Sequence, residues 1–161
     1  IQKTYCRNLR LVCARAEALP FPDDTFDCVS IGFALRNVSV IEQALGEMAR
    51  VLRVGGNLVC LEFSQPQHKV FRRIYRLYIF RVLPFLGRVI SRNREAYAYL
   101  PRSIMEFPSS FEIKRIMRKV GLRDIMVYPL TFGVATTYIA IKRASCDCCQ
   151  DKDGHGEKQT N

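Results

Sequence analysis

Two apolar stretches separated by a helix-length segment constrain the fold of this chain more than any other feature. The first, FDCVSIGFAL (26–35), alternates Val29, Ile31 and Phe33 with smaller or polar residues, as a half-buried strand does. The second, NLVCLEF (57–63), is almost continuously apolar, which is typical of a buried strand in a parallel sheet. Two such strands joined by a helix form a βαβ unit with a right-handed crossover. We therefore predict an α/β fold with a parallel sheet.

A segment of helical periodicity joins these two strands. Residues 39–53, SVIEQALGEMARVLR, place their apolar side chains on one face. Ser39 can cap this helix, and Gly55 and Gly56 are expected to end it. The other predicted elements are a short strand at 9–14, a loop at 17–26, a capped amphipathic helix at 109–121 that ends at Gly121, and two strands near 123–128 and 134–142.

Residues 66–106 differ in composition from the rest of the chain. Between Glu62 and Glu95 the sequence contains no acidic residue, and bases alternate with large apolar residues. This pattern indicates a basic amphipathic segment of two helices, broken near Pro84 and Gly87. Three interpretations are open: binding to an anionic membrane, binding to RNA, or a solvated charged face over a core stripe. The eight bases are Lys69, Arg72, Arg73, Arg76, Arg81, Arg88, Arg92 and Arg94.

Length, charge and cysteine content narrow the class of protein. The 161 residues suffice for one domain with a hydrophobic core, and the net charge of +10 favours an acidic partner. We expect neither a transmembrane segment nor a secretory signal. Seven cysteines without disulfide-like spacing favour a reducing compartment. The CDCC motif near His155 matches no zinc-ligand spacing, so we predict no metal site and a disordered tail at 144–161.

Four motifs resemble one family of enzymes. They are AEALPFPDDTFDCVSIGFALRNV, ALGEMARVLRVGGNLVCLEFSQP, YIFRVLPFLGRVIS and YAYLPRSIMEFP. Together they resemble the ubiquinone/menaquinone biosynthesis C-methyltransferases over about Leu9 to Lys142. Members of that family are class I S-adenosylmethionine enzymes that methylate a ring carbon of a prenylated quinol.

The resemblance implies a Rossmann-like class I methyltransferase fold. Its seven-stranded sheet is mostly parallel, with helices on both faces and an antiparallel final strand. The chain would supply the carboxyl-terminal portion, strands three to seven, with a helical insertion at about 66–106 in a partial methyltransferase domain at 1–143. The family's first strand, its Gly-rich loop and the acidic residue that ends strand two are then expected to precede Ile1. This places the main loop that binds S-adenosylmethionine outside the chain.

The resemblance also implies a site beyond the carboxyl ends of the strands. The implied catalytic or substrate-contacting pair is Arg36 and Asn37, the implied cofactor contacts are Arg15, Ala16 and Gly32, and the candidates that line the substrate cavity are Tyr78, Tyr97 and Tyr99. A guanidinium stays protonated, so Arg36 is expected to stabilise a developing phenolate while Asn37 holds a ring oxygen. A surface Arg–Asn pair that caps the following helix is the structural alternative.

The leading hypothesis is the carboxyl-terminal part of a methyltransferase that acts on a polyprenyl benzoquinol or a demethylmenaquinol. One alternative is a truncated, non-catalytic fragment that binds membrane or a complex, and another is a basic RNA-binding module. The implied partners are the quinol, a membrane contacted peripherally through the basic insertion, and a quinone-biosynthesis complex or a second copy; nucleic acid is not expected. The implied location is the bacterial cytoplasm or inner-membrane periphery, or the matrix side of the mitochondrial inner membrane.

Overall fold

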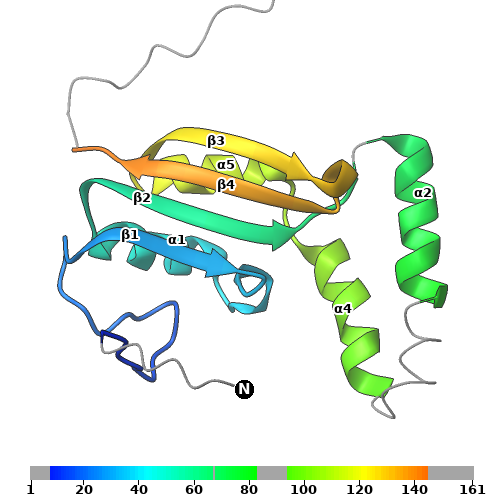
Figure 1. The fold of residues 1–161 in the computed structure, drawn as a ribbon, viewed down its shortest axis with the longest axis horizontal. Helices are drawn as coiled ribbons and strands as arrows, with labels where there is room; N and C mark the ends of the chain where they lie inside the picture. Colours follow the sequence, from blue (N-terminus) through cyan, green and yellow to red (C-terminus); the bar gives the residue numbers. More distant parts are fainter. Residues whose placement is uncertain (1–7, 67, 83–93, 145–161) are drawn as a thin grey trace, which may run out of the picture.

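A computed structural model describes residues 8–66, 68–82 and 94–144, with the backbone alone for 94–98. Its strands form one four-stranded sheet in the order β1-β2-β4-β3 (Figure 1). Strand β1 runs parallel to β2, and β4 is antiparallel to both of its neighbours. The elements are β1 (Phe26–Gly32), α1 (Ile41–Val51), β2 (Leu52–Phe63), α2 (Lys69–Leu77), α4 (Arg94–Glu106), α5 (Ser110–Lys119), β3 (Leu122–Leu130) and β4 (Ala135–Lys142).

The topology confirms the predicted βαβ unit and the antiparallel final strand. Helix α1 joins the parallel pair β1 and β2, and the last strand inserts between β2 and β3. Helix α5 is the capped helix expected from the sequence: the Ser109 hydroxyl accepts the backbone N–H of Glu112, and the Glu112 carboxylate accepts the N–H of Ser109. This capping box satisfies two N–H groups that a helix start leaves free. Gly121, just beyond α5, has the positive φ of 90° that favours glycine.

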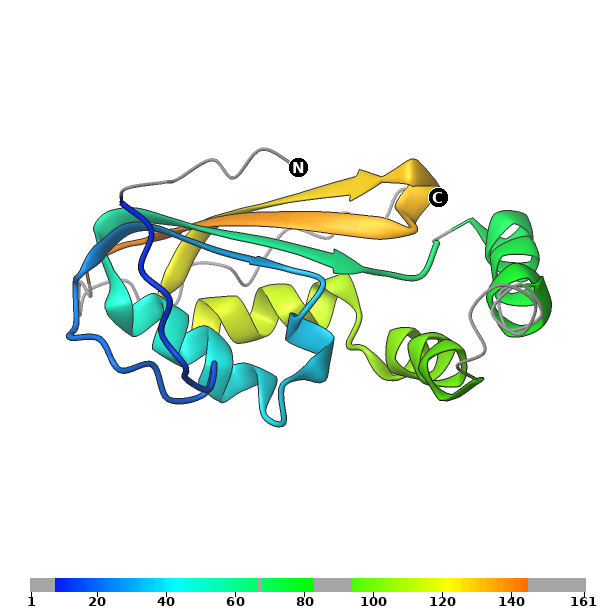
Figure 2. The same cartoon turned by 60° about the horizontal axis from the view of Figure 1, so that its bottom comes forward.

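The hydrophobic core lies between one face of the sheet and two helices. Both α1 and α5 pack on this face (Figure 2). Right-handed crossovers explain the arrangement, because β1, β2 and β3 follow one another in the same direction across the sheet and each crossover then falls on the same side. Fully buried members of this core are Leu35, Ala44, Leu45, Leu52, Leu58, Cys60, Ile113, Met117, Leu122 and Ala140.

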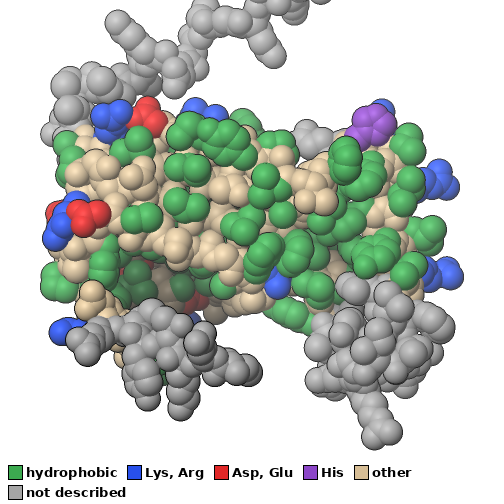
Figure 3. Space-filling model, viewed as in Figure 1, with side chains coloured by type: hydrophobic (Ala, Val, Ile, Leu, Met, Phe, Trp, Pro, Cys, Tyr) green, Lys and Arg blue, Asp and Glu red, His purple; other side chains and the backbone are tan. Residues whose placement is uncertain are grey.

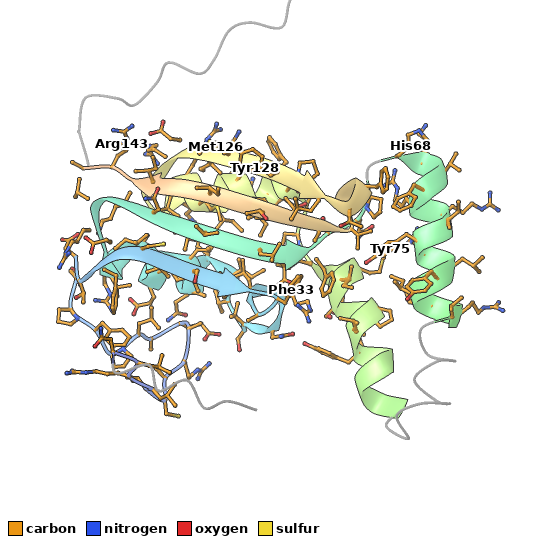
Figure 4. All side chains as sticks on the ribbon, viewed as in Figure 1. Phe33, His68, Tyr75, Met126, Tyr128 and Arg143 are labelled. Atoms are coloured by element: carbon orange, nitrogen blue, oxygen red, sulfur yellow. The ribbon has the colours of Figure 1, made fainter. Side chains whose placement is uncertain are left out.

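The opposite face of the sheet has no helix over it among the described residues. Val59, Leu61 and Phe63 of β2 are half-buried on this face, and Met126 and Tyr128 of β3 are exposed. Figures 3 and 4 view this face, where hydrophobic side chains lie over the strands. The expectation of a β2 strand buried on both sides is therefore wrong for the described part of the chain, which has helices on one face of the part of the sheet that it supplies.

Three predicted details of the amino-terminal half are wrong. Residues 9–14 do not form a strand; Leu11 is 89% exposed, and β2 is the one strand that pairs with β1 in the described part of the chain. Strand β1 ends at Gly32 rather than at residue 35, because Phe33 adopts a positive φ of 53° that turns the chain out of the sheet. Ser39 makes no capping hydrogen bond, since the residue at the N-cap position is Val40.

The glycines after α1 act in a bulge rather than as the helix stop. Helix α1 ends at Val51 and β2 begins at once, pairing Leu52 with Phe26 before the register jumps. Gly55, with φ at 84°, lies in the jump. A Cβ on Gly56 would come within 2.9 Å of two carbonyl oxygens, so only glycine fits there without a backbone shift.

The basic segment is helical on both sides of residues 83–93, which include the predicted break and lie outside the described residues. Helix α2 continues into a π-helical turn, Tyr78–Val82, and α4 follows. These helices stand beyond the carboxyl end of β2, apart from the sheet (Figures 1 and 2). No helix among the described residues is long and apolar enough to cross a membrane. The predicted tail also lies outside the described residues, apart from Ala144.

Candidate functional site at the carboxyl edge of the sheet

A short 3₁₀ turn, Leu35–Asn37, forms the centre of the candidate site. It follows the carboxyl end of β1, at the edge where the parallel strand β2 also ends. Leu35 is fully buried in the core and anchors the turn. The two residues after this anchor, Arg36 and Asn37, therefore have a fixed backbone position at the edge where α/β sheets bind ligands.

Glu62 holds Arg36 in place. The Glu62 side chain is fully buried, and its Oε1 lies 2.7 Å from Nη1 of Arg36. The second oxygen, Oε2, accepts the backbone N–H of Arg36 at 3.1 Å. The N–H of Phe63 also donates to the carboxylate, at 2.9 Å. The end of β2 is thus tied to the turn after β1 by both the side chain and the backbone of one arginine.

The Arg36 guanidinium is enclosed but not fully satisfied. Its side chain is 11% exposed, and its centre lies 5.2 Å from the ring centroid of Phe63. Nη1 donates to both Glu62 and the carbonyl of Phe33, whereas Nε is buried without a hydrogen-bond partner in the described part of the chain. A buried N–H of this kind costs free energy unless an acceptor reaches it. Because Nε is buried, a ligand oxygen would reach the guanidinium at Nη2, which makes no hydrogen bond within the described part of the chain.

Asn37 connects the turn to the basic insertion. The Tyr99 hydroxyl of α4 donates to Oδ1 of Asn37 at 2.9 Å. Since the amide oxygen accepts this bond, the amide NH₂ of Asn37 is left to donate elsewhere. The structural alternative, a helix cap, has no support from α1, which has no side-chain cap hydrogen bond.

The predicted substrate tyrosines separate in the structure. Tyr99 contacts the turn through Asn37, and Tyr78 is exposed on the π-helical turn after α2. Tyr97 lies in α4, but its side chain is outside the described residues. Of the two tyrosine side chains described, Tyr99 is therefore the one with a recorded contact to the site.

The predicted cofactor contacts lie in two segments. Arg15 is exposed and Ala16 packs against the core, next to Glu17, whose carboxylate accepts the N–H of Ser39 at 2.7 Å. That hydrogen bond holds the pKa of Glu17 below its usual range. The same hydrogen bond holds the loop that contains Arg15 and Ala16 near the start of α1, beside the carboxyl ends of β1 and β2. Gly32 ends β1 with open space where a Cβ would point, so a ligand can approach its backbone.

A cavity of about 290 Å³ lies where the carboxyl end of β2 meets α2, α4 and α5. A smaller one of about 190 Å³ shares Ser64, Gln65 and Ser110 with it. The larger volume is near the lower limit for small-molecule sites. None of the catalytic, cofactor-binding or substrate-binding residues predicted from the sequence lines either cavity. The larger cavity is lined by Ser64, Gln65, Pro66, Arg72, Ile104, Phe107, Pro108, Ser109 and Ser110.

Sequence reasoning missed the role of Glu62. The sequence analysis assigned no role to this residue, although the sequence carries a usable signal: Glu62 is the one acid in the apolar stretch NLVCLEF. A carboxylate buried in a sheet needs a cationic or N–H partner, and Arg36 follows the neighbouring parallel strand. No feature of the sequence marked Phe63 as a contact of Arg36, because an aromatic residue at a strand end is usually part of the core.

The loop before β1 is held to α1 by one ion-pair network. Glu47 accepts the N–H of Leu19 at 2.8 Å and pairs with Arg50 at 2.7 Å. Arg50 also donates to the carbonyls of Leu19 and Phe21 and pairs with Asp23. The Arg50 guanidinium, together with the Leu19 N–H, lowers the pKa of Glu47 from about 4.5 to about 2.

We expect this network to make stability depend on acid pH. A lowered folded-state pKa adds stability that is complete above pH of about 4.5 and is lost as pH falls toward 2. Urea unfolding between pH 6 and 3 should therefore show a steeper loss for the parent protein than for Glu47→Gln. Glu17 and Glu112 also have lowered pKa values. The parent protein and the Glu47→Gln variant both keep these two carboxylates, so their contributions cancel in the difference between the two curves. Parallel curves would show that the Glu47 carboxylate is not stabilised in the folded state.

Solved structures of methyltransferases have a fold similar to that of this chain. A S-adenosylmethionine-dependent methyltransferase from Thermotoga maritima superposes with a TM-score of 0.55 at 19% identity, over 85% of this chain and 66% of that one. A methyltransferase of Bacillus halodurans gives 0.55 at 15% identity, over 84% and 78%. At these identities the likeness concerns the fold, which is that of class I methyltransferases.

Sequence comparison then gives the family. Residues 1–142 match the model of the ubiE/COQ5 methyltransferase family, and the chain belongs to that family. The ubiquinone/menaquinone biosynthesis C-methyltransferase UbiE of Geobacter sulfurreducens is 49% identical over 138 residues, 86% of this chain and 54% of the relative. A demethylmenaquinone methyltransferase of Bacillus licheniformis is 42% identical over 88% of this chain and 62% of the relative. The chain thus spans roughly half the length of these relatives.

Proposed function

We propose that the chain is the carboxyl-terminal part of a quinol C-methyltransferase, which transfers a methyl group from S-adenosylmethionine to a ring carbon of a prenylated benzoquinol or naphthoquinol. Its family and the names of its relatives support this reaction. The observation that carries the proposal is the Arg36–Asn37 turn, which Glu62 and Tyr99 fix at the ligand-binding edge of the sheet. Neither the non-catalytic alternative nor the RNA-binding module gains support from the relatives.

Arg36 would act on the charge that develops during methyl transfer. As the quinol hydroxyl loses its proton, negative charge moves into the ring, and the ring carbon becomes nucleophilic. Nη2 of Arg36, which makes no hydrogen bond within the described part of the chain, can donate to the phenolate oxygen. The new carbon–carbon bond would form as the methyl–sulfur bond of the cofactor breaks, and the ring carbon would then give up its hydrogen as a proton. Arg36 cannot accept a proton, so water would take both protons lost and return one to the ring oxygen, which restores the hydroxyl.

Asn37 would orient the ring. Its NH₂ can donate to the second ring oxygen, since Tyr99 fixes the amide by donating to Oδ1. Ser64, one residue beyond the Phe63 ring that contacts Arg36, lines the cavity of about 290 Å³. We assign that cavity to the part of the substrate next to the ring.

The residues present fit one wall of a cofactor site. Gly32 has room for a close backbone contact, and Arg15 exposes its guanidinium on the loop that Glu17 ties to α1. Arg15, Ala16 and Gly32 would hold the adenosine side of S-adenosylmethionine. The bound cofactor would supply an electrophilic sulfonium methyl group. A quinone-biosynthesis complex or a second copy of the chain are further partners that this function would bring, at the bacterial cytoplasmic face or the mitochondrial matrix face of the inner membrane.

Calorimetric titration with S-adenosylmethionine tests the proposed function. The chain is measured by itself and then joined to the segment of the Geobacter sulfurreducens relative that it does not match. We expect the joined protein to bind the cofactor and to methylate a short-chain demethylated quinol, and the chain by itself to bind at least about tenfold more weakly, since one wall of the site leaves most cofactor contacts unmade. A folded joined protein that binds no S-adenosylmethionine would overturn the proposal.

A further inference from the structure

Helix α2 turns one face toward the protein. Tyr75 and Ile79 are buried, and the Phe71 ring lies 5.4 Å from the ring of Phe132, in the turn between β3 and β4. Figure 4 shows Tyr75 pointing from α2 toward α4. Burial also raises the pKa of the Tyr75 hydroxyl. These contacts fix the rotation of α2 about its own axis, so its other faces have defined directions.

A second face of α2 is apolar and exposed. Val70, Ile74 and Leu77 follow the spacing i, i+4, i+7, which places them in one stripe along the helix. Their exposed fractions are 64%, 58% and 62%. Single exposed apolar residues are common, but a continuous stripe of three aliphatic side chains on one helix marks an interaction surface.

A basic stripe lies directly beside the apolar one. Lys69, Arg73 and Arg76 are exposed and have the same spacing, offset by one residue, or about 100° around the helix. Figure 3 shows Lys and Arg side chains along the outer edge of α2, next to hydrophobic ones. The sequence from 63 to 94 contains no acid, so nothing within this segment offsets its positive charge.

We propose that the apolar and basic stripes of α2 form a docking surface for an anionic lipid bilayer, with Val70, Ile74 and Leu77 in the acyl boundary and the basic stripe at the headgroups. The combination of aliphatic and cationic stripes is that of helices that lie in a membrane interface. An RNA ligand would contact the cationic side chains and stack its bases on aromatic rings. RNA binding does not explain why three aliphatic side chains are exposed. The apolar stripe therefore favours lipid.

This surface stands on the same side of the molecule as the candidate site. Helix α2 lies beyond the carboxyl ends of β1 and β2, the edge that holds the Arg36–Asn37 turn (Figure 1). A membrane on α2 would thus face the edge of the sheet where a lipid-soluble substrate would enter. The lipid proposal does not depend on methyl transfer, and it can be tested on the chain itself, without cofactor or quinol.

Vesicle co-sedimentation gives the first test. We expect the chain to bind vesicles of phosphatidylglycerol and phosphatidylethanolamine, and not vesicles of pure phosphatidylcholine. Ile74→Asp should weaken binding at least about tenfold, because an aliphatic side chain no longer enters the bilayer. Arg73→Gln and Arg76→Gln should each weaken it about fivefold, and more salt should weaken it further.

Helix α5 provides matched controls. Phe111 is 76% exposed, and Arg115 is exposed on the same basic helix. Phe111→Asp likewise replaces an exposed apolar side chain by an acid, and Arg115→Gln repeats the arginine-to-glutamine change, both away from the two stripes. Vesicle binding should stay within about twofold of the parent. Circular dichroism checks the fold of each variant, which we expect to be kept because every altered side chain is exposed.

A fluorescence reporter distinguishes insertion from simple charge attraction. The chain contains no tryptophan, so Ile74→Trp and Phe111→Trp each introduce a single reporter. Anionic vesicles should shift the emission of Ile74→Trp to shorter wavelength and leave that of Phe111→Trp unchanged. The proposal is overturned if the parent does not bind anionic vesicles, or if Ile74→Asp and Phe111→Asp weaken vesicle binding equally. It is also overturned if single-stranded RNA displaces the vesicles and Ile74→Asp leaves vesicle binding unchanged.

Discussion

Replacing Glu62 by alanine is expected to lower the free energy of unfolding by about 3–5 kcal/mol. The Glu62 carboxylate is fully buried, and its loss would leave the guanidinium of Arg36, a side chain that is 11% exposed, without its counter-charge. The N–H groups of Arg36 and Phe63 would also lose their acceptor. Urea unfolding followed by circular dichroism near pH 7 measures the change.

A surface ion pair of the same residue types is the control for this prediction. Glu106 pairs with Arg102 at 2.8 Å, and both side chains are mostly exposed. Glu106→Ala should cost less than about 1 kcal/mol. The double variant Arg36→Leu, Glu62→Leu should be less destabilised than the sum of its single changes, because it leaves no unpaired buried charge. A loss for Glu62→Ala as small as that for Glu106→Ala would show that the buried pair does not stabilise this edge.

Arg36→Ala should reduce turnover in the joined, full-length protein about 10²- to 10³-fold. It removes the donor proposed for the developing phenolate, whereas the cofactor contacts on Arg15, Ala16 and Gly32 remain. We therefore expect the dissociation constant for S-adenosylmethionine to change by less than about threefold. Single-turnover methylation and calorimetry, made under conditions where unfolding experiments show the variant to be folded, measure the two quantities separately.

Arg53 provides the matched control for the turnover measurement. It lies at the opposite end of β2 and forms an exposed ion pair with Asp27. Arg53→Ala should leave turnover unchanged. Arg36→Lys keeps a positive charge beside Glu62 but loses the planar donor group, so it should recover stability while turnover stays low. Unchanged turnover in folded Arg36→Ala would remove Arg36 from the mechanism.

Much of the fold was predictable because local patterns and global packing agree. The strand predicted at 26–35, the helix predicted at 39–53 and the capped helix predicted at 109–121 reappear in the structure at 26–32, 41–51 and 110–119. Prediction failed where pairing or turn geometry decided the outcome. Residues 9–14 have a strand-like composition but form no strand, since a strand exists only when another one pairs with it.

The site shows the same division. The resemblance pointed to Arg36 and Asn37, and the structure places them on a turn anchored by Leu35. It added two contacts that sequence spacing could not supply: Glu62 is 26 residues from Arg36, and Tyr99 is 62 residues from Asn37. Contacts over such separations depend on strand order and helix placement, which periodicity does not encode.

The sequence by itself determined the α/β class, the βαβ unit and the basic amphipathic insertion, because hydrophobic period, helix signals and charge are local properties of a chain. The tertiary structure decided which strands are neighbours, that α1 and α5 share one face of the sheet, and that Glu62 is the partner of Arg36. It also decided that α2 turns Tyr75 inward, which leaves Val70, Ile74 and Leu77 exposed. The physical reason is that burial and pairing are properties of the packed chain: a side chain's surroundings depend on segments far from it in sequence.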